Sequence, residues 1–330
     1  MRAGDVNHPL IETRHLVKHY RIGRGVTLRA LDDVSLTVMP GQTLGLVGES
    51  GCGKSTLGRC LLQLTTITGG QILFDGRDIS GLSERALRPY RPQMQMVFQD
   101  SAASLNPRRR IADLLAEPLR IHRAPNIAAR LHELLDLTGL PRQALDRYPH
   151  EFSGGQRQRI NIARALALSP RLIVADEPVS ALDVSIQAQI VNLFADLRER
   201  LGLAYVFIAH DLSVVRQIAD RVAVMYLGAI VERGTTDDVL HRPAHPYTAA
   251  LISAIPRPVV GSRAGRTILI GDVPSPIAPP PGCRFHTRCP QAQARCRTDI
   301  PVLRPVDIQH DVACHFPLVD DAQNFTPTLP

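Results

Sequence analysis

The segment Gly48-Glu-Ser-Gly-Cys-Gly-Lys-Ser55 constrains this chain more than any other feature of its sequence. It fits the pattern G-x-x-x-x-G-K-[ST], between a short apolar run at 43–47 and a helical pattern at 55–64. Glycines let backbone N–H groups turn inward around an oxyanion, and the start of the helix adds a positive end. Such a pattern arises by chance on the order of once per hundred chains of this length. The sequence therefore predicts a phosphate-binding loop in an α/β core.

The residues of this loop have distinct expected roles. Lys54 would neutralise charge on the β- and γ-phosphates of ATP, and the Ser55 hydroxyl would ligate Mg²⁺. A kinase, a GTPase and a transport ATPase are all compatible with the loop alone. The predicted ATP contacts here are Gly48, Glu49, Ser50, Gly51, Cys52, Gly53, Lys54, Ser55 and Thr56.

Composition limits the classes of protein to which this chain can belong, but it does not identify one class. The chain has 330 residues, 44% of them hydrophobic, which is ordinary for a globular protein with one large or two smaller cores. Its longest apolar stretches run to about ten residues, whereas a membrane helix needs roughly 20. The N-terminus shows no apolar signal region, so a cytosolic protein is expected. The net charge of +7 is scattered along the chain and decides nothing.

The pattern of apolar residues changes along the chain. Near-alternation within 11–47 predicts strands of an antiparallel β subdomain, and helical periodicity within 83–150 predicts a helical insertion. From 160 to 209, helix and strand alternate, which predicts a parallel sheet covered by helices. The prolines after 255 disfavour long helices and interior strands. We therefore expect a phosphate-binding α/β domain at 10–255, with a helical subdomain at about 86–165, and an irregular Pro- and Cys-rich tail at 256–330.

An acidic pair, Asp176-Glu177, follows the apolar run 172–175. Ligands of open α/β sheets bind at the carboxyl ends of strands, where this pair would lie. Asp176 would hold Mg²⁺, and Glu177 would orient and polarise the attacking water. Alone the pair fits a solvated acidic turn equally well, but beside a phosphate loop it indicates catalysis.

A second glycine-rich helix start lies at Ser153-Gly-Gly-Gln156. Ser153 can cap the helix, and Gly154 and Gly155 leave backbone N–H groups bare at its positive end. One chain needs one cradle for a γ-phosphate. A second cradle makes sense if it completes a site on a partner chain.

In this combination the sequence resembles the ATP-binding cassette (ABC) family. Ser153-Gly-Gly-Gln156 is similar to the family's signature, with Phe152 where leucine is usual. The resemblance implies further site residues in order along the chain. Tyr20 would be an aromatic under adenine, and Gln99 would sense Mg²⁺ and the transmembrane subunit. Ser180-Ala-Leu-Asp183 would form a loop that crosses a dimer interface, and His210 would contact the γ-phosphate.

The resemblance also implies a mechanism and partners. Two nucleotides would lie in a head-to-tail dimer, each between one chain's phosphate loop and the other chain's Ser153–Gln156 segment. ATP would close the pair and hydrolysis, with Glu177 as base, would reopen it. The implied partners are an identical or paralogous ATPase subunit, two transmembrane permease subunits and a periplasmic or extracellular substrate-binding protein. The chain would lie peripherally on the cytoplasmic face of the inner (plasma) membrane.

Segments beyond the core resemble the ATPase subunits of bacterial oligopeptide and dipeptide importers. They are Asp100-Ser-Ala-Ala-Ser-Leu-Asn-Pro-Arg108, Arg233-Gly234, His245-Pro-Tyr247 and the tail. Relatives of this group carry nickel, opines or glutathione, and these substrates remain alternatives because the ATPase subunit does not bind the substrate. A soluble cassette ATPase acting on nucleic acid usually has two fused cassettes or basic arms, which this sequence lacks. A nucleotide kinase has no use for a second cradle.

Four cysteines crowd the tail with the spacing C-x₅-C-x₆-C-x₁₇-C: Cys283, Cys289, Cys296 and Cys314. This differs from the C-x₂-C pattern of common zinc sites. Four thiolates can hold a [4Fe–4S] cluster, and some relatives of the importer group carry one in such a tail. Zinc, with help from His286, His310 or His315, and free thiols are the alternatives.

Overall fold

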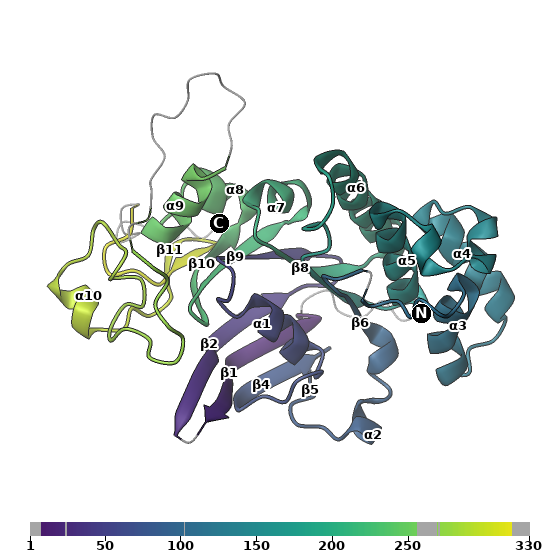
Figure 1. Ribbon diagram of the computed structural model, residues 1–330. Coiled ribbons are helices and arrows are strands. Elements are labelled where there is room, and N and C mark those ends of the chain that lie inside the picture. The colour runs from purple at the N-terminus through teal and green to yellow at the C-terminus, as the bar shows by residue number, and fades with distance from the viewer. Residues whose placement is uncertain (1–7, 24, 102, 256–268, 270, 319–330) are drawn as a thin grey trace, which may run out of the picture.

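The computed structural model describes residues 8–23, 25–101, 103–255, 269 and 271–318. Its main sheet has eight strands in the order β11-β12-β10-β9-β3-β8-β7-β6 (Figure 1). The central strands run parallel and are buried on both faces, which explains their continuous apolar sequences. The strands that precede the tail are β3 (Thr43–Val47), β6 (Met94–Val97), β7 (Leu172–Asp176), β8 (Ala204–Ala209), β9 (Arg221–Tyr226) and β10 (Ala229–Thr235).

A second, four-stranded antiparallel sheet lies below the main sheet in Figure 1. Its strands are β1 (Ile11–Gly23), β2 (Val26–Val38), β4 (Gly69–Phe74) and β5 (Arg77–Asp78). Helix α1 (Lys54–Leu61) packs between the two sheets and shares one apolar core with both. The short helix α2 (Glu84–Leu87) and the 3₁₀ turn η1 (Arg91–Gln93) lead from this sheet to β6.

The opposite face of the main sheet is covered by helices, and a second apolar core fills that layer. The covering helices are α6 (Val184–Leu201), α7 (Leu212–Ile218), α8 (Thr236–His241) and α9 (Pro246–Ser253). This core continues into the helical insertion, which contains α3 (Ile111–Ile121), α4 (Ile127–Thr138), η2 (Arg142–Asp146), η3 (Pro149–Glu151) and α5 (Gly154–Leu166).

The predicted fold class is confirmed: a parallel core sheet, an antiparallel β subdomain and a helical insertion are all present. Strand β6 falls within the range expected to be a helical subdomain, 86–165, yet it pairs in parallel with β7. Its four residues are too few to show a period that separates strand from helix. The helical subdomain therefore begins after β6, later than the sequence predicted.

The C-terminal tail, which we define as residues 256–330, contains α10 (Ala294–Thr298), β11 (Arg304–Asp307) and β12 (His310–Val312). Strand β12 pairs with β10, with Glu232 opposite Val312, so the tail extends the main sheet where an irregular appendage was expected. Pro305 is tolerated in β11 because that strand is outermost. Residues 256–268, 270 and 319–330 of the predicted tail lie outside the described residues.

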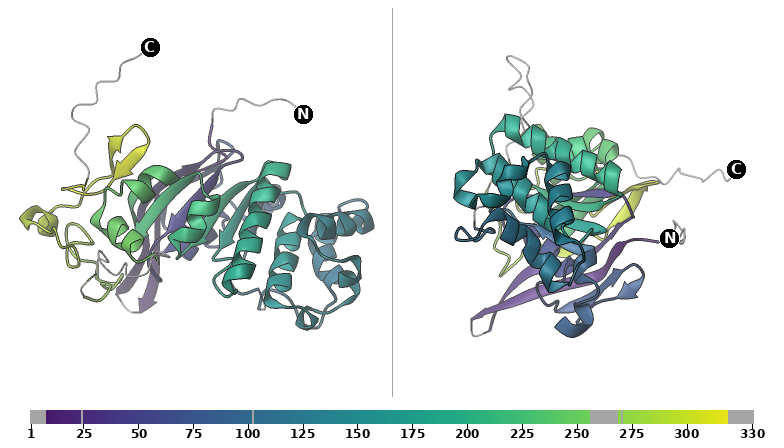
Figure 2. Two further views of the ribbon diagram at one scale, coloured as in Figure 1. Left: turned by 90° about the horizontal axis from the view of Figure 1, so that it is seen from above. Right: turned by 90° about the vertical axis from the view of Figure 1, so that its right-hand side faces the viewer.

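The tail and the helical insertion lie at opposite ends of the main sheet, as the view from above shows (Figure 2). No helix in the described part of the chain has both the length and the apolarity needed to cross a membrane.

Candidate nucleotide site

The phosphate loop turns sharply between β3 and α1, and two of its glycines have no room for a side chain. Gly48 has φ 152°, and a Cβ there would lie 2.2 Å from the carbonyl oxygen of Met225. Gly53 has φ 108°, and its Cβ would lie 2.3 Å from the carbonyl oxygen of Ala30. Both conformations favour glycine, so the loop pattern in the sequence is a direct consequence of this close backbone approach.

Lys54 is only 4% exposed and lies inside the curve of this loop. Its Nζ donates hydrogen bonds to the carbonyl oxygens of Gly48 at 2.7 Å and Glu49 at 3.0 Å. A buried ammonium is thereby held where the sequence predicts the phosphates of ATP.

The Ser55 hydroxyl donates to Asp176 Oδ1 at 2.8 Å, so the end of β7 meets the start of α1. Asp176 is 2% exposed, and burial raises the pKa of its carboxyl. A hydroxyl and a buried carboxylate side by side are oxygen donors of the kind that Mg²⁺ prefers. The residues present therefore fit a magnesium ion.

Three further predicted residues meet at the ends of neighbouring strands. Gln99 Nε2 donates to Glu177 Oε2 at 2.9 Å, and His210 Nδ1 lies 3.6 Å from the same oxygen. The Glu177 backbone has φ 45°, and its N–H donates to the carbonyl of Ile208 in β8 at 3.0 Å. The Glu177 carboxylate therefore lies between the amide and the imidazole, on a residue whose backbone is in the left-handed region.

These elements enclose a cavity of about 250 Å³ that Leu28, Ala30, Ser50, Gly51, Gly53, Lys54, Ser55, Thr56, Gln99, Glu177 and Pro276 line. Sequence reasoning missed Leu28, Ala30 and Pro276, because their types carry no chemical signal. Tyr20 lies on β1 opposite Leu28, and the ammonium of Lys18 is 4.5 Å from its ring centroid. Among the described residues, the lining of this cavity does not include Tyr20.

The Ser153 segment is placed differently. Ser153 Oγ accepts from Gln156 N at 3.3 Å, and Gln156 Oε1 accepts from Ser153 N at 3.0 Å, so the two residues cap α5 reciprocally. A Cβ on Gly155 would lie 2.6 Å from Ile186, so α5 begins against the start of α6, beside Asp183. Ser153, Gln156 and Asp183 are exposed, and within the described ranges none of them lines the cavity above.

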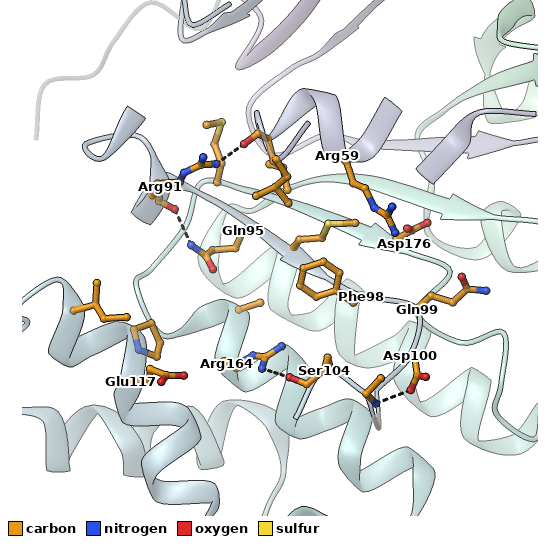
Figure 3. A pocket seen from close by; sticks show the side chains of 18 residues that line it. Arg59, Arg91, Gln95, Phe98, Gln99, Asp100, Ser104, Glu117, Arg164 and Asp176 are labelled. Atoms are coloured by element: carbon orange, nitrogen blue, oxygen red, sulfur yellow. Dashed lines mark hydrogen bonds between the residues drawn. The ribbon is translucent and has the colours of Figure 1, made fainter. Parts of the chain in front are cut away.

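A groove of about 740 Å³ runs between β6, α3 and α5 (Figure 3). Its walls are apolar at Phe98 and Ile121, with charged side chains such as Arg59 and Glu117 around them. Gln99 lines both this groove and the nucleotide cavity. One side chain therefore connects the two spaces.

The four tail cysteines line one small cavity of about 10 Å³, together with His245, His286 and His315. Burial raises the pKa of the Cys283 and Cys289 thiols. Burial also raises the pKa of the Cys314 thiol, to about 11. Burial therefore favours the neutral form of these three thiols. In the described part of the chain, no three His, Cys, Asp or Glu side chains are already arranged as ligands of a metal ion. His310 does not join the cysteines, because its Nε2 lies 2.7 Å from Glu232 Oε1.

Known proteins share this sequence and architecture. A model of the ABC transporter family matches residues 31–180, and a model of the oligopeptide/dipeptide transporter C-terminal region matches 231–296. A putative peptide import ATP-binding protein of Brucella ovis is 54% identical over 309 residues, which cover 93% of this chain and 97% of the relative. The oligopeptide transport ATP-binding protein AppF of Bacillus subtilis is 51% identical over 318 residues, with 93% and 97% covered.

Solved structures of ABC proteins are similar to this chain in fold. The cbiO1 protein of Clostridium perfringens, part of the ABC transporter complex cbiONQ, has a TM-score of 0.64 and 26% identity, covering 72% of this chain and 92% of its own. The dimeric ATP-binding cassette MJ0796 in a post-hydrolysis state with ADP and Pi has a TM-score of 0.62 and 29% identity, covering 68% and 98%. The chain is therefore a member of the ABC transporter family of ATPases, in its oligopeptide/dipeptide group.

Proposed function

We propose that this chain is the ATP-hydrolysing subunit of a bacterial importer of oligopeptides or dipeptides. The observation that carries the motor role is the position of Gln99, which binds Glu177 and lines both the nucleotide cavity and the groove beside β6. The names of the relatives from Brucella ovis and Bacillus subtilis favour peptides as the substrate class. Nickel, opines and glutathione remain the alternatives.

In this proposal the phosphate loop and Lys54 bind the triphosphate, with Tyr20 near the base. Ser55, Gln99 and Asp176 would hold Mg²⁺, which when bound would neutralise developing charge on the phosphates. Glu177 takes a proton from the attacking water, and His210 contacts the γ-phosphate. The short distances among Ser55, Asp176, Gln99 and Glu177 support these roles.

The exposed segment Ser153–Gln156 would complete the site of a partner ATPase subunit, identical or paralogous, and Asp183 would lie at that interface. Support comes from geometry: the start of α5, with the N–H groups of Gly154 and Gly155, does not line the chain's own nucleotide cavity within the described residues. The similar cassette MJ0796 is described as dimeric.

The groove would take an amphipathic segment of a permease subunit. Leu64, Phe98 and Ile121 are 48%, 38% and 58% exposed along it, while Arg59, Arg91, Glu117 and Arg164 offer charges of both signs. Two permease subunits would hold the chain at the cytoplasmic face of the membrane, and a substrate-binding protein would deliver peptide from the far side. The ranges 10–255 and 256–330 stay our proposal for the domains, and of the helical subdomain predicted at about 86–165 we keep the part after β6.

The test is a pull-down of the tagged full chain from detergent-solubilised membranes, with partners identified by mass. Permease subunits are expected, and Ile121→Asp should reduce their recovery while an exposed control, Ile308→Asp, should not. Vesicles with the recovered complex should take up labelled peptides in an ATP-dependent manner. Recovery of RNA in place of permeases would contradict the proposal, and uptake of nickel, opine or glutathione without peptide would correct the substrate class.

We further propose that the four tail cysteines bind a metal centre, because all four face one cavity. A [4Fe–4S] cluster is the first candidate and zinc is the alternative. Iron, sulfide and zinc analysis of protein purified without oxygen decides between them. Cys296→Ser should lower the metal content, and Cys60→Ser, at a buried cysteine within α1, should not. Wild-type protein free of iron and zinc would leave the cysteines as plain thiols.

A further inference from the structure

The C-terminal tail reaches the phosphate loop through one buried arginine. Arg288 Nη1 and Nη2 donate to the two carboxylate oxygens of Glu49 at 2.7 and 3.0 Å. The Arg288 side chain is 7% exposed and that of Glu49 is 25% exposed. Two parallel, charge-assisted bonds of this kind combine strength with a fixed orientation. Arg288 directly precedes Cys289, so this contact belongs to the cysteine-bearing segment.

We propose that Arg288 is a positioning residue for ATP binding, which neutralises and holds Glu49 so that the phosphate loop accepts the triphosphate. The inference rests on the proposed function, because it concerns the same nucleotide cavity. It assigns the tail a part in nucleotide binding that neither its proline content nor its cysteines indicated.

Three residues hold Glu49, and Arg288 is the partner that comes from the described part of the tail. The Glu49 N–H donates to the Tyr247 hydroxyl at 2.8 Å, and its carbonyl accepts from Lys54 Nζ at 3.0 Å. Tyr247 in turn packs against Phe285 of the tail, with ring centroids 5.4 Å apart. Since Glu49 lies between Gly48 and Ser50, a shift of its side chain would move the N–H groups of the loop.

The charge of Glu49 makes the arginine necessary. A carboxylate in a phosphate loop repels a bound triphosphate unless a cation neutralises it. The bond to Glu49 raises the pKa of Arg288, so the guanidinium stays charged at every working pH. Removing the arginine alone would leave an uncompensated carboxylate within the phosphate loop, whereas removing both charges would restore neutrality.

A second contact between tail and site supports the idea independently. Pro276 lines the nucleotide cavity, and its carbonyl accepts the N–H of Arg29 in β2 at 3.1 Å. The described tail therefore contacts the phosphate loop at Glu49 and the cavity wall that contains Leu28 and Ala30.

Arg284 provides a matched control. It lies in the same tail segment and is 17% exposed, but it binds the Asp32 carboxylate and the Leu227 carbonyl, outside the phosphate loop. Arg284→Gln should loosen the tail without freeing a charge next to the phosphates.

The experiment measures equilibrium binding of fluorescent mant-ATP and mant-ADP, with Mg²⁺, to the purified full-length chain. Arg288→Gln should weaken ATP binding about tenfold, and ADP binding less because ADP carries less charge. Glu49→Gln should bind ATP at least as tightly as wild type. The double variant Glu49→Gln/Arg288→Gln should recover most of the lost affinity, and Arg288→Lys should retain it. Glu49→Gln should not rescue Arg284→Gln.

Wild-type affinity in Arg288→Gln would overturn the inference, as would a double variant as weak as Arg288→Gln, because the arginine would then have no electrostatic role. If Arg288→Gln does not fold, Arg288→Lys and the double variant still decide, since loss of ATP affinity in both contradicts the inference. A wild-type chain that binds no nucleotide would instead remove the proposed function.

Discussion

The side-chain amide of Gln99 donates a hydrogen bond to the carboxylate of Glu177 over 2.9 Å. Gln99 follows β6 and Glu177 follows β7, and these two strands pair in parallel with Val97 beside Ala175. The amide also lines the groove proposed for the permease. A partner that displaces Gln99 would therefore release the proposed catalytic base directly, without a longer chain of contacts.

Glu177→Gln removes the negative charge but keeps the size of the side chain and a partner for Gln99. Phosphate release should fall by about 10²–10⁴-fold, because proton transfer to a positioned base contributes on that scale. ATP binding should persist, and light scattering should detect a dimer trapped by ATP. Glu199→Gln, on the exposed side of α6, is the matched control with normal turnover. Full hydrolysis by Glu177→Gln would refute the assignment of the base.

Lys54→Ala removes a buried ammonium from the centre of the phosphate loop. Titration calorimetry should show that MgATP affinity falls tenfold or more, about 1.4 kcal/mol or above. The substitution also removes the hydrogen-bond donor of the Gly48 and Glu49 carbonyls, which could unfold the loop. The unfolding midpoint of the variant, measured without nucleotide, is therefore the control that shows whether the protein is still folded. Unchanged affinity in a folded variant would count against the loop as the phosphate site.

Ser153→Arg places a long side chain at an exposed helix start that does not line its own chain's cavity, as far as the described residues show. Binding of ATP to the single chain should be unchanged, whereas ATP-dependent dimer formation and turnover should be lost. Ser153→Thr keeps the capping hydroxyl and should retain both. Normal turnover of Ser153→Arg would exclude a role for this segment on a partner's nucleotide.

Stability should depend on pH through His245, which is 1% exposed and accepts the N–H of Tyr247 at 3.0 Å. Burial lowers the pKa of this imidazole from its ordinary 6.5 to about 4, so the unfolded chain binds the extra proton between these values. The free energy of unfolding should therefore decrease as pH falls from 6.5 toward 4, by about 2 kcal/mol at pH 5. Urea unfolding at several pH values measures this, and His245→Asn should flatten the slope. An equal slope in both proteins would assign the effect to other groups.

Features that depend on neighbouring residues could be predicted from the sequence. The phosphate loop, the capped start of α5 and the acidic pair after β7 each follow from backbone chemistry within a few positions. The contact between Arg288 and Glu49 joins residues 239 positions apart, and although Glu49 lies in the phosphate-loop pattern, no local pattern predicts its pairing with Arg288. Pro276 in the cavity wall and the pairing of β12 with β10 were missed for the same reason, because both depend on the path of the whole chain.

The pairing of β12 with β10 has a consequence for any shortened form of this protein. A chain that ends near residue 255 would leave the backbone N–H and carbonyl groups of β10 that face β12 unpaired, and exposed strand edges of this kind associate with other molecules. Glu232 in β10 is fully buried and would lose His310, one of its hydrogen-bond partners. We therefore expect an isolated cassette domain to self-associate during expression, for reasons that have nothing to do with ATP.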